Sequence, residues 1–579
     1  MFLAVLSGIL LPLALPNELF PWGNPALGLV AIAPLYMALA STSSYGLAFL
    51  ATAIFGGLAH GLSSYWLWFF KDFRYWTLGS STLAYMVVYG CLGLYLRGAL
   101  KRSGLYRVIV FAAVWTVFEW GKSNGFLGYP WGLLPFSWNN VLPAIQITES
   151  TGVYGLGFAL VMISGGLAEI ILSRQSILTH PSQDEGPTGL AARIIPPLPS
   201  GKGSLVAGSG PLVVAVLLMI GILGYGCLAL SRPREPRGSF SAVLVQQNID
   251  AWESAGGEEE ALSVSVALAT AAMETAGRKP DIILFSETSL KRPWEEFRSY
   301  YSRTPREDPL IPFLARTGAW LFTGLPEILD WDTYDATNSV VLINPQGEQV
   351  ASYAKMHPVP FAEALPFWEY DGFRSFIQNV VGLESGWTMG TERLIFELPT
   401  SSAGLVKFAG PICFEDAFAY LCRRFVNDGA EIFINLTNDS WSKTRSAEIQ
   451  HFVAARFRSV EARRVLVRST NGGVSGIVMP DGSLRDLLPL FSPEARQVDI
   501  PVYTGETTPY MLFGDWFVAL LAIALAGLLV LVVVGDIDSR KTSIGEPEVL
   551  SPFHYGQDKT ILESEALISM RAEEPDERP

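Results

Sequence analysis

The sequence predicts two kinds of structure in one chain, an α-helical membrane domain and an α/β domain that lies outside the membrane. Half of the residues are hydrophobic and only 17% are charged, whereas soluble proteins average about 25% charged residues. No Asp, Glu, Lys or Arg occurs between Leu19 and Phe70, which is too long an uncharged stretch for a soluble domain. Residues of about 238–510, in contrast, alternate strand-like apolar runs with helical patterns, as α/β domains do.

The membrane domain is predicted from apolar segments, because about 20 apolar residues are needed to cross the hydrocarbon core of a bilayer. Such segments occur at residues 2–16, 25–41, 45–69, 76–98, 107–121, 151–172, 207–230 and 516–535. Seven predicted helices therefore precede the polar region and one follows it. We expect a membrane domain at 1–235, an outer α/β domain at 236–512, a last membrane helix at 513–536 and a disordered cytoplasmic tail at 537–579.

The positive charges between the segments predict the orientation, because cytoplasmic loops of membrane proteins are enriched in Lys and Arg. The loop at 97–107 and the segments that follow the sixth and eighth helices carry such charges. These parts are expected in the cytoplasm, and an odd number of spans then places residues 236–512 on the outer side. Arg232, Arg234 and Arg237 lie on the outer side in this arrangement and oppose it.

Within the outer domain, short runs rich in β-branched and aromatic residues predict strands. The predicted strands are 242–247, 282–286, 320–325, 339–343, 393–398, 405–412, 432–436, 465–469 and 476–479. Helical periodicity predicts helices at 258–276, 309–317, 417–427 and 446–462. This alternation indicates an α/β sandwich whose sheets are largely buried.

Charge and cysteine content exclude several classes of function. The net charge of −14 argues against a nucleic-acid partner, which would require a basic face. Four cysteines are too few for a disulfide framework, and a Cys413–Cys422 disulfide is not expected. The five histidines are scattered, with no His-x-x-x-His or Cys-x-x-Cys pair, so we expect no metal site and no cofactor.

The uncharged segment 123–148, between the fifth and sixth predicted helices, is rich in Gly, Pro and Trp. Irregular backbone at membrane depth is tolerated only where protein covers it or where it lines a cavity. The segment is therefore either a re-entrant or interfacial segment or an ordinary loop of the aromatic belt. Glu119 and Glu149 lie on either side of it, and both readings of these carboxylates, as interface anchors or as functional groups, remain open.

The strongest candidate for chemistry is Cys413, in the segment Gly-Pro-Ile-Cys-Phe-Glu-Asp at 410–416. An apolar strand-like run ends just before it, and an amphipathic helical pattern begins just after it. A cysteine on such a turn is displayed as a nucleophile, and the positive end of the following helix is expected to favour its thiolate. The alternative is a buried structural cysteine, which is common at strand ends.

Two further residues lie at strand ends and supply what a nucleophilic cysteine needs, namely a base and a cation for the oxyanion. Glu287 ends a nearly all-apolar run and is the candidate base. Lys355 ends another run and is the candidate oxyanion partner. Taken singly, each could be an ordinary surface residue.

The joint pattern resembles the Glu-Lys-Cys triad of the nitrilase superfamily. It consists of a Glu, a Tyr-x-Lys followed by Pro-Phe-x-Glu at 353–363, and a Cys-aromatic-Glu, in that order. Asn-Leu-Thr-Asn-Asp-Ser-Trp at 435–441 and the helix and strand after it are similar to the same superfamily. The seven N-terminal spans, the final span and Gly-Tyr-Pro-Trp at 128–131 resemble one membrane branch, the bacterial apolipoprotein N-acyltransferases, over almost the whole chain.

The resemblance implies a four-layer αββα catalytic domain in which Glu287 is the general base, Lys355 the oxyanion partner and Cys413 the nucleophile. Glu363 and Glu415 match accessory carboxylates of the family. Two further residues are implied as substrate-binding or accessory: Phe414, which stands where the family commonly has Tyr, and Trp252, which matches a substrate-contacting Trp.

The resemblance also implies a reaction. An acyl chain would pass from a phospholipid such as phosphatidylethanolamine to a thioester on Cys413. It would then pass to the N-terminal amine of the diacylglyceryl-cysteine of an apolipoprotein. The implied location is the bacterial inner membrane, with the catalytic domain in the periplasm. Residues 358–376, with Phe361, Leu365, Phe367 and Trp368, are expected to shield the thioester from water.

Two other functions stay open at this stage. A membrane-anchored amidase would use the same triad on a small C–N substrate, but such a substrate gives no reason for eight spans. A transporter or receptor could keep the outer domain without its chemistry, although the presence of all three triad residues argues against this.

Overall fold

The protein is described from a computed structural model of the chain. It describes residues 1–70, 74–101, 104–179, 205–250, 257–287, 289–304, 306–333, 335–360, 362–365, 370–376, 378–379, 386–503 and 507–544. The N-terminal helices and the α/β domain belong to one compact unit, residues 1–186 with 197–528. A second unit comprises 187–196 and 529–579, of which the structure describes residues 529–544 as the end of a helix.

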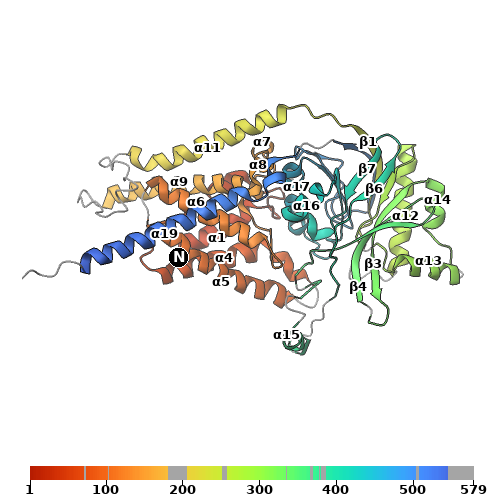
Figure 1. Cartoon of the computed structure of the whole chain (residues 1–579), viewed down its shortest axis with the longest axis horizontal. Coiled ribbons are helices and arrows are strands. Elements are labelled where there is room, and N and C mark those ends of the chain that lie inside the picture. Colours follow the sequence, from red (N-terminus) through yellow and green to blue (C-terminus); the bar gives the residue numbers. More distant parts are fainter. Residues whose placement is uncertain are drawn as a thin grey trace, which may run out of the picture. The chain divides into compact units, whose positions relative to one another are not determined.

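Apolar helices form the N-terminal part of the molecule, and each predicted span corresponds to helical structure (Figure 1). The helices are α1 (Phe2–Ala14), α2 (Pro25–Val30), α3 (Ala33–Ala40), α4 (Tyr45–Ser63), α5 (Ser81–Ala99), α6 (Gly104–Ser123), α9 (Val153–Thr179) and α11 (Leu205–Ser231), with α19 (Trp516–Ile544) near the C-terminus. Among the described residues, five helices, at 45–63, 75–99, 104–123, 153–174 and 209–231, are long and apolar enough to cross a membrane. Those at 2–14, 25–40 and 516–532 are apolar but shorter, so the structure is compatible with eight spans.

Short helical turns connect these helices on the side that meets the α/β domain. They are η1 (Tyr65–Phe69), η2 (Tyr75–Ser80), η3 (Leu134–Trp138), α7 (Leu142–Ile145) and α8 (Thr148–Thr151). The segment 130–139 is buried almost throughout. Its backbone is satisfied within the protein, since the N–H of Leu134 donates to Glu119 Oε1 at 3.0 Å and the carbonyl of Trp131 accepts from Lys122 Nζ at 2.6 Å. The segment is thus covered by protein, as the re-entrant reading requires.

Two six-stranded sheets form the centre of the α/β domain. The first has the order β12-β1-β2-β3-β4-β5 and the second the order β11-β10-β9-β8-β7-β6. The first sheet contains β1 (Gly238–Gln246), β2 (Ile282–Leu284), β3 (Trp320–Asp330), β4 (Asp335–Ile343), β5 (Gln349–Ala354) and β12 (Glu494–Val502). The second contains β6 (Phe396–Thr400), β7 (Gly404–Ala409), β8 (Ile432–Thr437), β9 (Val465–Thr470), β10 (Gly476–Val478) and β11 (Leu484–Arg485).

Helices cover the outer face of each sheet, which gives the four-layer sandwich that the resemblance implies. One layer is α12 (Gly257–Ala276), α13 (Trp294–Arg303) and α14 (Ile311–Thr317), and the other is η5 (Cys413–Ala417), α16 (Ala419–Asn427) and α17 (Arg445–Ala462). Alternate strand residues divide the core accordingly, since Val243 packs with the α12 layer and Leu244 packs between the sheets. Two short helices, α15 (Asp371–Phe376) and α18 (Pro509–Phe513), complete the domain.

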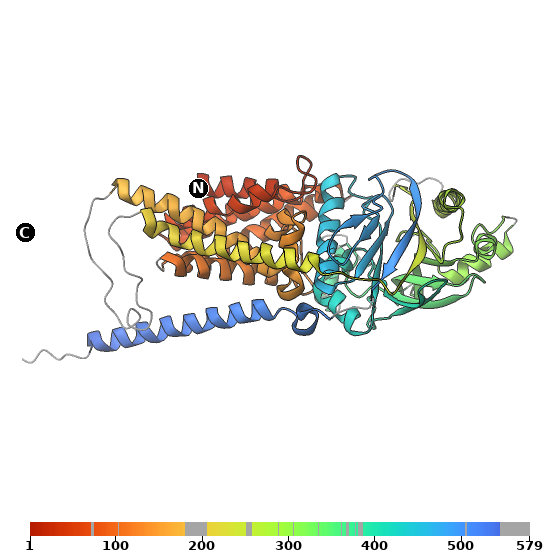
Figure 2. The ribbon, with the colours of Figure 1, turned by 90° about the horizontal axis from the view of Figure 1, so that it is seen from above.

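Helix α17 lies between the second sheet and the apolar helices, as the cyan layer of Figure 2 shows. Every residue from Ser446 to Ala462 is buried. Gln450 donates to the carbonyls of Pro16 (2.8 Å) and Ser63 (3.0 Å). Arg456 donates to the side chains of Asn139 and Asn140 at 3.0 and 2.7 Å. The membrane helices and their connecting turns therefore form the outer wall of this layer.

The structure differs from the sequence prediction in several elements of the α/β domain. The strands β11 and β12 and the helices α13, α15 and α18 were not predicted, and the helix expected at 417–427 begins instead with the 3₁₀ turn η5. The strand expected to end at Lys355 is β5. β12 lies at the edge of the first sheet and pairs only with β1. An edge strand can carry polar residues such as Arg496, Gln497 and Asp499, so its sequence lacks the apolar run from which a strand is predicted.

Candidate active site

Cys413 occupies the turn at the carboxyl end of β7, at the first position of η5. The bridge from Ile412 to Leu436 extends the parallel pairing of β7 with β8 up to this point. Cys413 has φ 48°, in the left-handed region that side chains other than Gly rarely adopt. Such backbone strain often accompanies a functional residue, and the position agrees with the predicted display of a nucleophile at a strand end.

The prediction that a helix end favours the Cys413 thiolate is wrong for the resting site. Burial, followed by the charge of Glu287, raises the pKa of the thiol well above its usual value, although Lys355 opposes this. The element that begins at Cys413 is a five-residue 3₁₀ turn and not a long α-helix, so its dipole is small. Cys413 therefore needs a base to become nucleophilic.

Glu287 lies just beyond β2 and is 5% exposed. Its Oε1 accepts from Asn338 Nδ2 at 2.8 Å, its Oε2 accepts from the N–H of Asn438 at 3.0 Å, and it shares a hydrogen bond with the Cys413 side chain. Burial raises the pKa of Glu287, and the positive charge of Lys355 opposes the increase. A carboxylate with a raised pKa in contact with a thiol is suited to take its proton near neutral pH.

Lys355 follows β5 and is 1% exposed, so its ammonium group is buried with its counter-ions. Its Nζ donates to Glu363 Oε1 at 2.7 Å and lies 3.7 Å from Glu287 Oε1. Although burial lowers the pKa of Lys355, the charges of Glu363 and Glu287 outweigh it and raise the pKa, so that the amine stays protonated. A fixed cation beside the thiol can stabilise an oxyanion.

The two accessory carboxylates hold the loop that carries Lys355. Glu363 accepts from Lys355 and, through Oε2, from the N–H of Val359 at 2.7 Å. Glu415 is fully buried and accepts from the N–H groups of Ile412 and Met356 at 2.8 and 2.7 Å. It also accepts from the N–H of His357 and from the hydroxyl of Tyr353. Glu415 thereby ties the turn of Cys413 to the strand end of Lys355.

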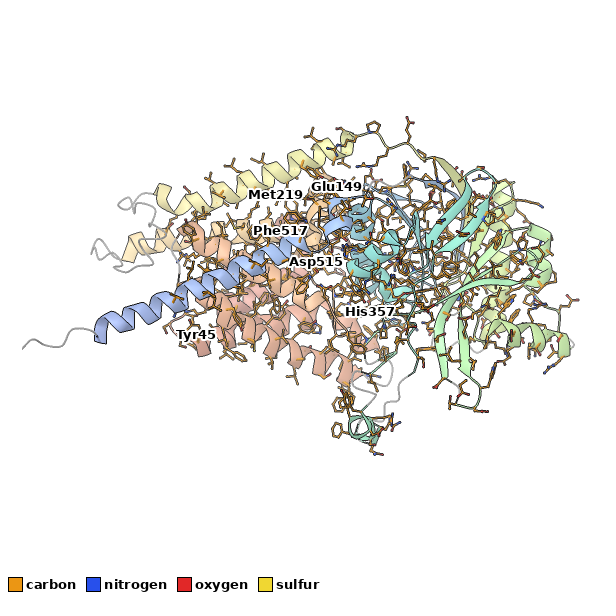
Figure 3. All side chains as sticks on the ribbon, viewed as in Figure 1. Tyr45, Glu149, Met219, His357, Asp515 and Phe517 are labelled. Atoms are coloured by element: carbon orange, nitrogen blue, oxygen red, sulfur yellow. The ribbon has the colours of Figure 1, made fainter. Side chains whose placement is uncertain are left out.

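The side chain of Phe414 lies in a column of stacked rings that crosses from the helical part to the sandwich. Trp131 stacks on Phe414 with centroids 5.1 Å apart and on Tyr129 with centroids 5.3 Å apart. On its other side Phe414 stacks on His357, which Figure 3 labels where the helical bundle meets the sandwich. Phe414 thus contributes through ring packing, which does not require the hydroxyl of the Tyr that the family commonly has at this position.

A buried polar network behind Cys413 was not predicted from the sequence. Its members are Asp416 of η5, Asn435 of β8, Asp439 of the loop after β8, His451 of α17 and Arg468 of β9. They are far apart along the chain and meet only because β8 and β9 are neighbours beneath α17. The one signal in the sequence is a charged residue within an apolar run, Arg468 in the predicted strand 465–469.

Some predicted residues lie outside the described part of the chain, namely Trp252, Phe361, Phe367 and Trp368. Leu365, the remaining member of the predicted cover, is buried. Among the described residues, no cluster of His, Cys, Asp and Glu is arranged to hold a metal ion. All four cysteines are free thiols, including Cys422 in α16.

The fold and the Glu-Lys-Cys arrangement define a nitrilase-type domain joined to membrane helices. The carbon-nitrogen hydrolase family matches residues 242–510, and the apolipoprotein N-acyltransferase N-terminal domain family matches residues 7–166. The chain belongs to the apolipoprotein N-acyltransferase family, as its full-length relatives show. It is 37% identical to apolipoprotein N-acyltransferase 2 of Treponema denticola, over 89% of this chain and 94% of that protein.

Two other relatives extend the match. The chain is 33% identical to apolipoprotein N-acyltransferase 2 of Treponema pallidum, over 89% of this chain and 92% of that protein. It is 29% identical to the apolipoprotein N-acyltransferase of Borreliella burgdorferi, over 90% of this chain and 93% of that protein. Each match includes both the membrane helices and the sandwich, which excludes a partial resemblance confined to the hydrolase fold.

Proposed function

We propose that this chain transfers an acyl group from a membrane phospholipid to the N-terminal amine of a diacylated apolipoprotein, through a thioester on Cys413. The chain is an N-acyltransferase of lipoprotein maturation by its family membership. The observation that carries the mechanism is the meeting of the buried Glu287 and Lys355 with the partly buried Cys413 beside the apolar helices.

In the first half-reaction, Glu287 takes the proton of the Cys413 thiol, with which it shares a hydrogen bond. The thiolate attacks the carbonyl carbon of a phospholipid ester, and the carbonyl oxygen becomes an oxyanion. Lys355 stabilises this oxyanion together with the backbone N–H of Phe414. The C–O bond then breaks, Glu287 returns its proton to the leaving oxygen, and a lysophospholipid leaves the thioester behind.

In the second half-reaction, the α-amine of diacylglyceryl-cysteine attacks the thioester carbonyl. Glu287 accepts the proton that the amine loses, the C–S bond breaks, and an amide forms while Cys413 is released and reprotonated by Glu287. One carboxylate serves both halves, because a carboxyl with a raised pKa can alternate between base and acid near neutral pH. Water must be excluded for transfer to prevail over hydrolysis, and the burial of Glu287 and Lys355 beside the partly buried Cys413 supports this.

The two carboxylates Glu363 and Glu415 position the triad in this proposal. Glu363 orients the ammonium group of Lys355, and Glu415 fixes the backbone on both sides of the site. The Phe414 ring keeps the oxyanion-binding N–H in place by its stacking on Trp131.

We further propose that the chain resides in the bacterial inner membrane and that its catalytic domain is periplasmic. The sequence supports this by the Lys and Arg of the loops on the opposite side. Phosphatidylethanolamine is the proposed donor. Both substrates are lipids, and the position of the site beside the apolar helices suits reactants that stay in the bilayer.

The test is intact-protein mass spectrometry of the detergent-purified chain after incubation with phosphatidylethanolamine. The wild type should gain one acyl group, removed by hydroxylamine and by a diacylated lipopeptide, whereas Cys413→Ser should gain none. Cys422→Ser is the matched control and should still be acylated, because Cys422 lies within α16 and outside the triad. Turnover of small amides without a lipid adduct would overturn the proposal in favour of an amidase, and phosphatidylglycerol in parallel tests the choice of head group.

A further inference from the structure

The backbone of Cys413 is held by the network that the proposed mechanism does not use. The carbonyl of Cys413 lies 3.1 Å from Asn435 Nδ2 and 3.2 Å from His451 Nε2. The same Nε2 lies 3.0 Å from Asp416 Oδ1, and Nδ1 of His451 lies 2.8 Å from Asp439 Oδ2. The left-handed φ of 48° at Cys413 is thus accompanied by two side-chain hydrogen bonds to its own carbonyl.

The acceptors around His451 determine its protonation state. Nε2 faces a carbonyl and a carboxylate, and Nδ1 faces a second carboxylate, so both ring nitrogens are required as donors. A neutral imidazole has only one N–H, and with that proton on Nε2 the Asp439 carboxylate would exchange the ring donor at 2.8 Å for the more distant Arg468 Nη2 at 3.8 Å. The geometry therefore calls for an imidazolium ion.

The surrounding charges favour this ion on balance. Arg468 lies 3.4 Å from Nδ1 of His451 and opposes its charge, but Arg468 also pairs with Asp416 Oδ2 at 3.2 Å. With His451 charged, two cations and the two aspartates balance each other. Glu448 of α17 adds little negative charge, because burial and Asp439 raise its pKa well above the usual value. Burial lowers the pKa of His451, but Asp439 and Asp416 raise it overall to about 9.

We propose that His451, held as an imidazolium ion between Asp439 and Asp416, is a positioning residue that fixes the strained turn of Cys413 so that its thiol meets Glu287. The residue acts through the Cys413 carbonyl and touches no substrate. This inference rests on the proposed function in one respect, that Cys413 is the nucleophile of the acyl transfer. It predicts that the nucleophile loses its orientation when His451 loses its proton.

The experiment compares the rate of Cys413 acylation by phosphatidylethanolamine from pH 6 to pH 10 in the wild type and in Asp439→Asn. Removal of an opposite charge beside His451 lowers its pKa by about 1–3 units. The alkaline decline of the acylation rate should move down by about 1–2 pH units in Asp439→Asn. Asp439 also helps to raise the pKa of Cys413, so Asp439→Asn lowers that pKa as well, and a thiol that ionises more readily should speed acylation at alkaline pH rather than slow it. The first half-reaction has no acceptor amine to titrate.

Two variants keep the comparison decisive. Asp428→Asn removes a partly exposed carboxylate that pairs with Arg393 at 2.5 Å and is not among the charges that shift the pKa of His451, so it should leave the alkaline decline where the wild type has it. His451→Gln keeps an N–H donor for the Cys413 carbonyl but cannot titrate, so acylation should be about tenfold slower, about the worth of one hydrogen bond, without the His-dependent decline.

The outcomes separate this inference from the proposed function. An Asp439→Asn protein that is slower at every pH but declines at the wild-type pH would overturn the positioning role, because loss of structure alone does not move the decline. If the wild type forms no acyl adduct, the proposed function fails. The same pH comparison is then made with the rate of Cys413 alkylation by iodoacetamide, which reads the orientation of the thiol without a lipid.

Discussion

The two helical layers of the sandwich have opposite surroundings, although each covers one six-stranded sheet. In the α12 layer, buried and exposed side chains alternate, and Glu295 and Glu296 of α13 are exposed. In the other layer α17 is buried throughout. The α12 layer has its own hydrophobic core, whereas a single core runs from the space between the sheets through α17 into the apolar helices.

This difference shows what burial against the membrane helices requires of the charged residues in α17. A buried charge is stable only where it is paired and hydrogen-bonded, and α17 contains several charged residues. Arg458 pairs with Glu461 at 3.0 Å, and Arg463, which ends α17, pairs with Glu149. Such pairs fix the geometry of the interface. Because the loss of one partner leaves a buried charge unpaired, few substitutions are tolerated there. The comparison can be tested by breaking equivalent contacts in the two layers.

The largest difference is expected from ion pairs. Arg463→Met leaves Glu149 buried without its cation and removes the bond to Gln146 Oε1 at 2.7 Å, so the free energy of unfolding should fall by about 3–5 kcal/mol. On the outer side, Asp499→Asn breaks a pair with Arg278 whose side chains are 47% and 56% exposed, which should cost about 0–1 kcal/mol. Thermal unfolding in one detergent measures both. Equal losses would show that the interface charges are as solvated as the surface pair.

A smaller difference is expected from aromatic residues. Phe457 of α17 is fully buried and packs against Phe136 of η3 with ring centroids 5.3 Å apart. Phe457→Ala should lower the free energy of unfolding by about 3–4 kcal/mol. Tyr300 of α13 is only partly buried, so Tyr300→Ala should cost about 1–2 kcal/mol. A loss at Phe457 no larger than at Tyr300 would mean that the membrane helices do not close over α17.

The smallest difference concerns pH. The folded pKa of His451 is raised to about 9, so the stability contributed by its charge is present below about pH 6.5 and is lost as pH rises toward 9. The unfolding temperature of the wild type should therefore fall between pH 6.5 and pH 9, by the equivalent of about 1–2 kcal/mol. His451→Gln should lack this part of the decline, whereas Asp499→Asn should keep it. A decline of the same size in His451→Gln would assign it to other groups.

The triad could be predicted from the sequence because each member lies at the end of an apolar strand within a spaced motif. Glu287, Lys355 and Cys413 are close together in the structure, as predicted, and their catalytic roles remain a proposal. The network of His451 could not be predicted, because its partners come from separate elements that only the sheet order brings together. The raised pKa of the Cys413 thiol could not be predicted from the sequence either, because it depends on burial rather than on the helix that follows.

The contacts of Gln450 with Pro16 and Ser63 make the α/β sandwich depend on the membrane helices. Gln450 precedes His451 directly, so one turn of α17 faces both the membrane helices and Cys413. A sandwich released by cleavage near residue 236 would expose that turn to water and lose the wall that holds it. The sandwich and the membrane helices are thus interdependent, and neither half is expected to work when it is expressed alone.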